Sequence, residues 1–166
     1  MKVSQALLWI TDLPNCPAVY ALYGGTGKRA HVAYVGITDS LKRRVGQHLL
    51  GRDSSIATGT SAAGINPDYV TEVRWWKHRR FSESAAREAA ELVAFALFDP
   101  ALRSRKPIGK AARELYKNRR FRKEMEVLLK KGPTGHVHLP SPEQVVRRLA
   151  TLEDRLAKIE KRLKAD

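Results

Sequence analysis

The residues of this chain whose types and spacing best fit a chemical reaction lie within its first hundred positions. They are two tyrosines in short β-rich runs, an arginine and a histidine in the segment that follows, and a glutamate in an apolar run: Tyr20, Tyr34, Arg44, His48 and Glu91. Hydrolysis of a phosphodiester bond needs a positioned nucleophile, stabilisation of the charge that builds on the phosphate, and help for the leaving oxygen. Phenols, a guanidinium, an imidazole and one carboxylate can supply these functions.

The chemistry of each side chain suggests a role. A tyrosine hydroxyl can orient or deprotonate water, although its usual pKa near 10 requires help from a cation or metal-bound water. We interpret Tyr20 as the group that activates the water and Tyr34 as the group that positions it, and the sequence leaves the reverse assignment open. Arg44 would bind phosphate oxygens through two hydrogen bonds. His48 follows Arg44 by one helical turn, so it would bind phosphate or relay a proton.

Glu91 needs a partner because the segment around it, residues 89–98, is otherwise uncharged. A carboxylate in such a segment must be paired, protonated or bound to a metal. A single acid suits Mg²⁺, or Mn²⁺ in its place, because Mg²⁺ keeps several water ligands. Glu88 is the alternative ligand, and an ion pair between Glu91 and Arg87 or another basic residue is the alternative explanation.

The order and spacing of these residues resemble the GIY-YIG nuclease family. The family's two motifs correspond to Ala18-Val19-Tyr20 and Tyr34-Val35-Gly36, and the later motif residues correspond to Thr38, Leu41, Arg44, His48, Glu91 and Pro100. The resemblance covers about residues 16–100. It implies a metal-dependent endonuclease that acts on DNA, with a three-stranded antiparallel sheet flanked by helices. The family's asparagine after the catalytic helix is missing, since Arg103 and Ser104 stand there, and this leaves open a non-catalytic nucleic-acid-binding protein.

The fold expected to position these residues is of the α+β class. Alternating and apolar runs predict three strands, over residues 18–23, 31–37 and 69–77. One helix is predicted between the second and third strands, capped by Asp39 or Ser40. Another is predicted after the third strand, capped by Ser82 or Ser84, with its end at Asp99-Pro100. The stretch 51–67, which is rich in small and polar residues, is predicted to be a surface loop.

Composition favours a globular protein that binds a polyanion. With 43% hydrophobic residues the chain can form a core, and its net charge of +14 predicts salt-sensitive binding to nucleic acid. A merely basic protein or one that docks on anionic membrane is the alternative. The single cysteine, Cys16, excludes an internal disulfide, and no apolar run is long enough for a membrane span. We therefore expect a soluble cytoplasmic protein.

We expect three parts along the chain: a GIY-YIG-like domain over 1–105, a basic helical extension over 106–135 and a C-terminal amphipathic helix over 136–166. The extension is predicted to be helical without interruption from 110 to 131. Basic residues in the first two parts are expected to bind the phosphates of DNA, double-stranded DNA in particular: Lys42, Arg43, Arg103, Arg105, Lys106, Lys110, Arg113, Lys117, Arg119 and Arg120.

Two features of the last part concern assembly and metal binding. Apolar residues alternate at spacings of four and three, as in a coiled coil: Val145, Leu149, Leu152, Leu156, Ile159 and Leu163. This seam predicts either a homodimer through the C-terminal helix or a helix that folds back on its own domain. His136 and His138 are able to contact a metal, but zinc requires further ligands, so the segment is predicted to be an extended loop.

Overall fold

A computed structural model describes residues 10–25, 27–49, 70–103 and 107–139, and in the C-terminal segment residues 150–153, 155, 156 and 159. Several predicted features lie outside the described residues: the surface loop over 51–67, Arg105, Lys106, Val145, Leu149 and Leu163.

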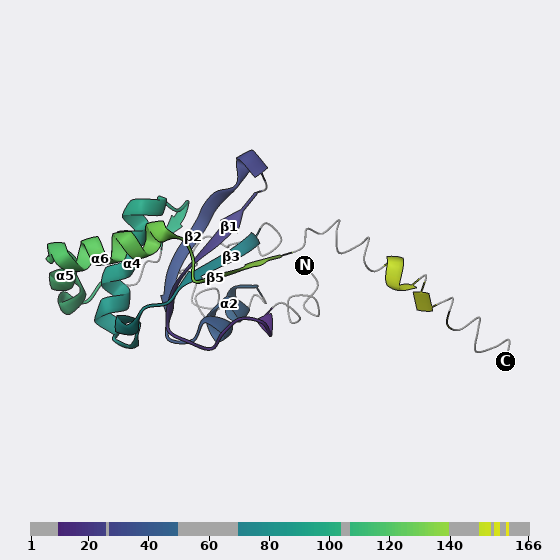
Figure 1. Cartoon of the computed structure of the whole chain (residues 1–166), viewed down its shortest axis with the longest axis horizontal. Helices are drawn as coiled ribbons and strands as arrows, with labels where there is room; N and C mark the ends of the chain where they lie inside the picture. Colours follow the sequence, from purple (N-terminus) through teal and green to yellow (C-terminus); the bar gives the residue numbers. More distant parts are fainter. Residues whose placement is uncertain are drawn as a thin grey trace.

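The centre of the fold is a five-stranded sheet with the strand order β4-β2-β1-β3-β5. Figure 1 labels β2, β1, β3 and β5 of this sheet. Its strands are β1 (Ala18–Gly24), β2 (His31–Thr38), β3 (Val70–Trp76), β4 (Leu102–Arg103) and β5 (Gly135–His138). The predicted antiparallel arrangement of the first three strands is confirmed. The predicted size of the sheet is wrong, because β4 pairs in parallel with β2 and β5 pairs antiparallel with β3.

The two additional strands are edge strands with little signal of their own. β4 has two residues, too few to show the alternation that marks a strand. β5 was expected to be an extended loop; its backbone is extended, but it is paired over four positions with β3. Each of these strands follows a helix, so its pairing depends on where that helix ends relative to the sheet.

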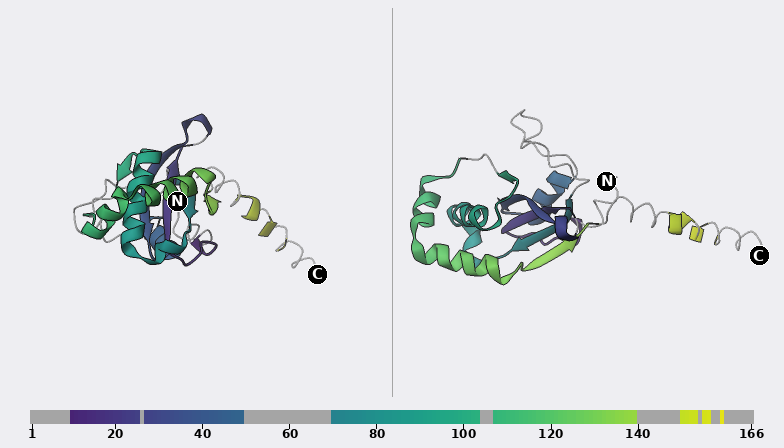
Figure 2. Two further views of the ribbon diagram at one scale, coloured as in Figure 1. Left: turned by 60° about the vertical axis from the view of Figure 1, so that its left-hand side comes forward. Right: turned by 90° about the horizontal axis from the view of Figure 1, so that it is seen from above.

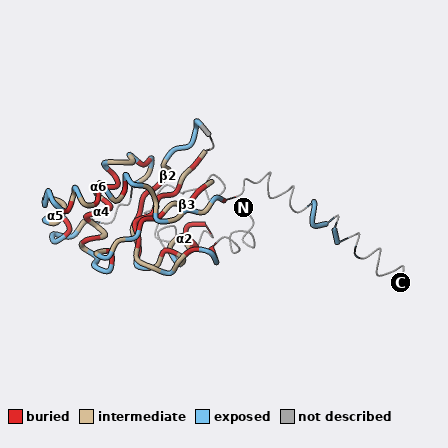
Figure 3. The backbone as a smooth tube through the Cα atoms, in the orientation of Figure 1, coloured by how far each residue is buried: buried red, intermediate tan, exposed pale blue. Residues whose placement is uncertain are grey.

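Helices cover both faces of the sheet (Figure 2). They are α2 (Leu41–Leu49) on one face and α4 (Ser84–Phe98) on the other, with α5 (Lys110–Lys117) and α6 (Arg119–Lys131) packed against α4. Successive side chains of a strand point to opposite faces, so that Tyr20 packs in the core under α2 whereas Val19 and Ala21 pack in the core under α4. Buried residues run through the central strands and the inner sides of the helices (Figure 3).

Helix α4 is preceded by a short 3-10 helix, η3 (Arg79–Ser82). The N-cap of α4 is Glu83, whose side chain makes no capping hydrogen bond. The prediction that Ser82 or Ser84 caps α4 is therefore wrong. The predicted end is confirmed. Asp99 adopts the left-handed conformation with φ 40°, and its N–H donates to the carbonyl oxygen of Phe95.

The basic extension is not one helix but two, because Asn118 interrupts it. Asn118 ends α5 and begins α6, and its side-chain oxygen accepts a hydrogen bond from the N–H of Phe121. Asparagine at such a position satisfies a backbone donor that the first turn leaves unpaired. The break lets both helices pack on α4, where Ala112 of α5 and Phe121 and Met125 of α6 are buried.

In the described part of the C-terminal segment, Leu152, Leu156 and Ile159 are each more than half exposed. These three side chains of the predicted seam therefore lie uncovered within a single chain. Among the described residues, no helix is both long enough and apolar enough to cross a membrane.

Candidate active site

Three aromatic rings from separate elements meet on the α2 face of the sheet. Tyr20 comes from β1, Tyr34 from β2 and His48 from α2, and the ring centroids are 6.0, 5.9 and 5.2 Å apart for the pairs Tyr20–Tyr34, Tyr20–His48 and Tyr34–His48. The Tyr20 hydroxyl is 2.7 Å from Nε2 of His48. This is a short, buried hydrogen bond between a phenol and an imidazole.

The register of β1 and β2 explains why the phenols are neighbours. Tyr20 pairs with Gly36, and Leu22 pairs with Tyr34, so the two tyrosines are diagonal neighbours on one face. A Cβ atom at Gly36 would lie 2.7 Å from the Tyr20 hydroxyl oxygen and 2.7 Å from Cε1 of Tyr34. Glycine is required at this position because the two rings occupy the space above it.

Burial controls the ionisation of Tyr20, whose side chain is fully enclosed. Burial raises the pKa of this phenol well above its usual value of 10.0, and the neighbouring Tyr34 adds to the rise. Arg44 opposes the rise through its positive charge and a hydrogen bond. Tyr20 is therefore a neutral phenol at physiological pH, held between a guanidinium and an imidazole.

Tyr34 connects the residues of α2 with Glu91 of α4. Burial makes the largest contribution to the raised pKa of its phenol, and the negative charge of Glu91 adds to it. The charge of Arg44 and hydrogen bonds with Tyr20 and Arg44 act in the opposite direction. The five predicted residues thus converge, with Tyr34 in electrostatic reach of both the acid and the guanidinium.

Residues 16–94 match the family model of the GIY-YIG catalytic domain. This segment is a GIY-YIG domain. The match contains all five converging residues and confirms the resemblance found in the sequence; it ends within α4, so α5, α6 and β5 are additions to the matched region. No curated protein and no solved structure shows significant similarity to the chain.

Hydrogen bonds hold the start of α2 in place, and α2 carries Arg44 on the side of the two phenols of the GIY-YIG domain. The N–H groups of Leu41 and Lys42 donate to the carbonyl oxygens of Cys16 and Pro14. Thr38, the motif residue at the end of β2, donates its hydroxyl to the carbonyl oxygen of Ser40 at 3.0 Å. The turn between strand and helix is therefore held at both ends.

The side chain of Arg44 has a neighbour that sequence reasoning missed. Its Nη1 donates to Oε1 of Gln47 at 3.3 Å. Residues three apart on a helix share a face, and this spacing is the signal by which Gln47 could have been found. Gln47 restrains the guanidinium from the side of the helix.

Glu91, the predicted metal ligand, lies on α4 and is only 3% exposed. The alternative ligand, Glu88, has a structural use: it accepts hydrogen bonds from the Gly109 N–H at 3.0 Å and from the Ser84 hydroxyl at 3.2 Å. Gly109 is the N-cap of α5, so Glu88 attaches the extension to α4. Arg87 donates to the carbonyl oxygens of Phe81 and Ser82 in η3.

The predicted phosphate-binding residues that are described lie at the surface, some of them with local partners. Arg43 pairs with Asp39 at 2.7 Å, Arg103 with Asp99 at 3.0 Å and Lys117 with Glu114 at 2.9 Å. Lys42 is partly exposed and donates to the carbonyl oxygen of Thr11 at 3.3 Å. The exposed basic residues on α5 and α6 include Lys110, Arg113, Arg119 and Arg120.

Sequence reasoning did not include two further arginines on this basic surface. Arg79 and Arg80 of η3 line a pocket of about 580 Å³ together with Arg120 and the start of α6. Glu124 also lines it and lies 3.9 Å from Arg80. The adjacent arginine pair after β3 was the available signal, but its proximity to α6 depends on the packing of the extension.

Proposed function

We propose that this chain is a metal-dependent endonuclease that hydrolyses DNA phosphodiester bonds. The observation that supports it most strongly is the convergence of Tyr20, Tyr34, Arg44, His48 and Glu91 within a GIY-YIG domain. Two phenols, an imidazole and a guanidinium from three elements meet within electrostatic reach of a buried acid, and these are the functional groups that the reaction requires.

The metal would be held by Glu91. Its carboxylate is nearly fully buried on an apolar helix, and its charge reaches Tyr34. One carboxylate, completed by water and phosphate oxygens, fits Mg²⁺ or Mn²⁺. When bound, such an ion supplies positive charge to the phosphate and lowers the pKa of coordinated water.

The proton of the attacking water would leave through Tyr20 and His48. A free phenolate is scarce at neutral pH because burial raises the pKa of Tyr20. The 2.7 Å hydrogen bond allows the Tyr20 proton to move to a neutral His48 as the phenol oxygen takes a proton from water. In this proposal Tyr20 activates the water and Tyr34 orients it.

Arg44 would stabilise the charge on the phosphate. Its guanidinium lies close enough to both phenols to lower the pKa of each, and Gln47 restrains it. A guanidinium offers paired donors to two phosphate oxygens. Removing a donor of this kind typically lowers the rate by about 10²–10³.

The basic surface would bind the DNA backbone. The net charge of +14 predicts affinity that falls steeply with salt. Dimerisation through the C-terminal seam, whose described residues Leu152, Leu156 and Ile159 are exposed, would bring two active sites to one duplex.

A plasmid-nicking assay with Mg²⁺ or Mn²⁺ tests the proposal. Glu91→Gln and Arg44→Ala should lower cleavage at least 100-fold while leaving most DNA binding intact. Arg29→Ala is the matched control for Arg44, because Arg29 is an exposed arginine between β1 and β2 and is not among the predicted DNA-binding residues. The control should cleave at a rate close to that of the unaltered chain.

A second candidate is a DNA-binding protein that does not cleave. It is favoured by one observation: Arg103 and Ser104 stand where the GIY-YIG resemblance calls for asparagine, and Arg103 lies in β4 beside Val35 of β2. If the unaltered chain binds DNA but cleaves none with any divalent metal, this candidate replaces the endonuclease.

A further inference from the structure

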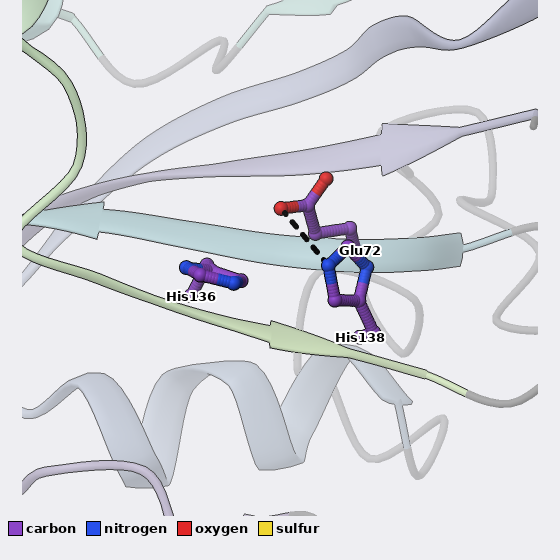
Figure 4. Close-up of side chains that lie close together, drawn as sticks. All are labelled: Glu72, His136 and His138. Carbon is purple, nitrogen blue, oxygen red and sulfur yellow. Dashed lines mark ion pairs between the residues drawn. The ribbon is translucent and has the colours of Figure 1, made fainter. Parts of the chain in front are cut away.

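Two histidines and a glutamate meet at the edge of the sheet formed by β3 and β5. His138 lies directly opposite Glu72 in the strand pair, and His136 lies two register positions away, opposite Arg74, so the two histidines are on the same face. Each of the three residues offers a ligand atom, and these atoms lie within 4.8 Å of one another. Figure 4 shows the three side chains projecting from the neighbouring strands, with Glu72 and His138 joined at 4.0 Å.

This cluster is separate from the candidate active site. Val73 and Trp75 alternate with Glu72 along β3 and belong to the same core as Tyr20 and Tyr34. Because neighbouring side chains of a strand point to opposite faces, Glu72 and its partners lie on the other face of the sheet. A ligand bound there would not touch the phenols.

We propose that Glu72, His136 and His138 bind a Zn²⁺ ion. Imidazole nitrogens favour zinc and related transition metals over Mg²⁺, and two histidines with one carboxylate and water complete a tetrahedral site. Ligand atoms in such a site are roughly 3.3–3.5 Å apart, given metal–ligand distances of about 2.0–2.2 Å. His136 and His138 are exposed, so small side-chain rotations can bring their nitrogens to that spacing.

Arg74 prepares Glu72 for this role. It donates from Nε to Oε1 at 2.8 Å and from Nη2 to Oε2 at 2.9 Å, and its guanidinium lies 4.2 Å from the centre of the Tyr23 ring. Burial acts to raise the pKa of the Glu72 carboxyl, but the hydrogen bonds and charge of Arg74 hold it below its usual value. Each carboxylate oxygen keeps a second lone pair for a metal. Arg74 thus keeps the carboxylate ionised and oriented, as outer-shell partners of metal ligands do.

The position of the site indicates what the ion would do. Glu72 lies inside the matched GIY-YIG region, whereas His136 and His138 lie in β5, beyond it. A zinc ion shared between them would tie the extension formed by α5, α6 and β5 to the edge of the GIY-YIG sheet. Its function would be structural attachment of the basic extension, independent of the ion held by Glu91.

Calorimetric titration of the full chain with ZnCl₂ tests the proposal. Every titrated protein is prepared without a histidine tag and carries Glu91→Gln, so that the proposed catalytic ligand does not contribute to the zinc signal. We expect one equivalent of Zn²⁺ to bind, and a hundredfold excess of Mg²⁺ not to displace it. His136→Ala and His138→Ala should each weaken binding at least tenfold, and the double variant should abolish it.

His31→Ala is the matched control, because His31 is also an exposed histidine on a strand, β2, but lies outside the cluster. It should leave zinc affinity unchanged. The two cluster histidines are exposed, so circular dichroism of the double variant should match that of the parent. Equal zinc affinity in parent and double variant, or no zinc binding by the parent, would overturn the site. Neither result depends on whether the chain cleaves DNA.

Discussion

Histidines lie beside a phenol on one face of the sheet and beside a carboxylate on the other, and the two faces differ in how far these histidines are exposed to solvent. On the α2 face His48 is buried and hydrogen bonded to the fully enclosed phenol of Tyr20. On the other face His136 and His138 are exposed beside Glu72, which Arg74 keeps ionised. Burial favours the neutral phenol and ties its proton to a partner, whereas exposure leaves imidazoles available to a ligand from solvent. Histidines on the two faces therefore lie in environments that favour different chemistry.

The change with the largest expected effect removes the hydroxyl from the buried face. Tyr20→Phe keeps the ring but breaks the hydrogen bond to His48, so the proposed proton transfer from water loses its first acceptor. Loss of a general acid–base group typically costs about 10²–10⁴ in rate. Single-turnover cleavage of a plasmid measures the effect.

Tyr23→Phe makes the same change on the other face. Tyr23 packs under Arg74 and belongs to the opposite core, so its hydroxyl should have no effect on cleavage. Equal rates for the two variants would mean that the Tyr20 hydroxyl plays no part in proton transfer.

A methyl group at Gly36 should disturb the packing of the buried face. In Gly36→Ala the new Cβ would meet the Tyr20 hydroxyl oxygen at 2.7 Å, so the phenols must move. Overpacking of this kind costs about 1–3 kcal/mol of unfolding free energy. Urea denaturation measures the loss, which should accompany reduced cleavage.

Gly46→Ala is the control within the same face. Its Cβ would meet only Ile10, at 3.7 and 3.8 Å, which is ordinary van der Waals contact. Alanine is more favourable than glycine inside a helix by up to about 1 kcal/mol. This variant should be as stable as the parent or more so; a loss equal to that of Gly36→Ala would count against the steric explanation.

The smallest expected effects are changes in stability with pH. Tyr20 on one face should affect stability at alkaline pH, and Glu72 on the other face should affect it at acidic pH. The pKa of Tyr20 in the folded state is raised above its usual value of 10.0, so its contribution to stability is fully present below pH 10 and is lost as the pH rises through the raised value. The pKa of Glu72 is lowered from 4.5, so its contribution is present above that pH and is lost as the pH falls through the lowered value.

Unfolding free energies of the parent, Tyr20→Phe and Glu72→Gln across the pH scale test both signs. The difference between parent and Glu72→Gln should shrink in acid, and the difference between parent and Tyr20→Phe should shrink above pH 10. Differences that stay constant with pH would contradict the assigned causes.

Much of the fold was predictable because its signals are local. The three main strands and the end of α4 at Asp99 follow from short-range patterns of apolar and turn residues. The interruption at Asn118 has a local signal too, yet a helix through this position is equally compatible with the surrounding residues. The choice was made by packing, since α5 and α6 must each turn a buried face to α4.

The sequence by itself determined the candidate functional groups: five side chains at the positions of the GIY-YIG resemblance, and the strongly positive charge of the chain. Tertiary structure alone decided the environment of each group. It enclosed Tyr20, brought Glu91 of α4 within electrostatic reach of Tyr34, and paired β5 with β3 so that His136 and His138 meet Glu72. Desolvation and the pairing of distant segments depend on how the whole chain packs, and local sequence patterns alone do not determine either.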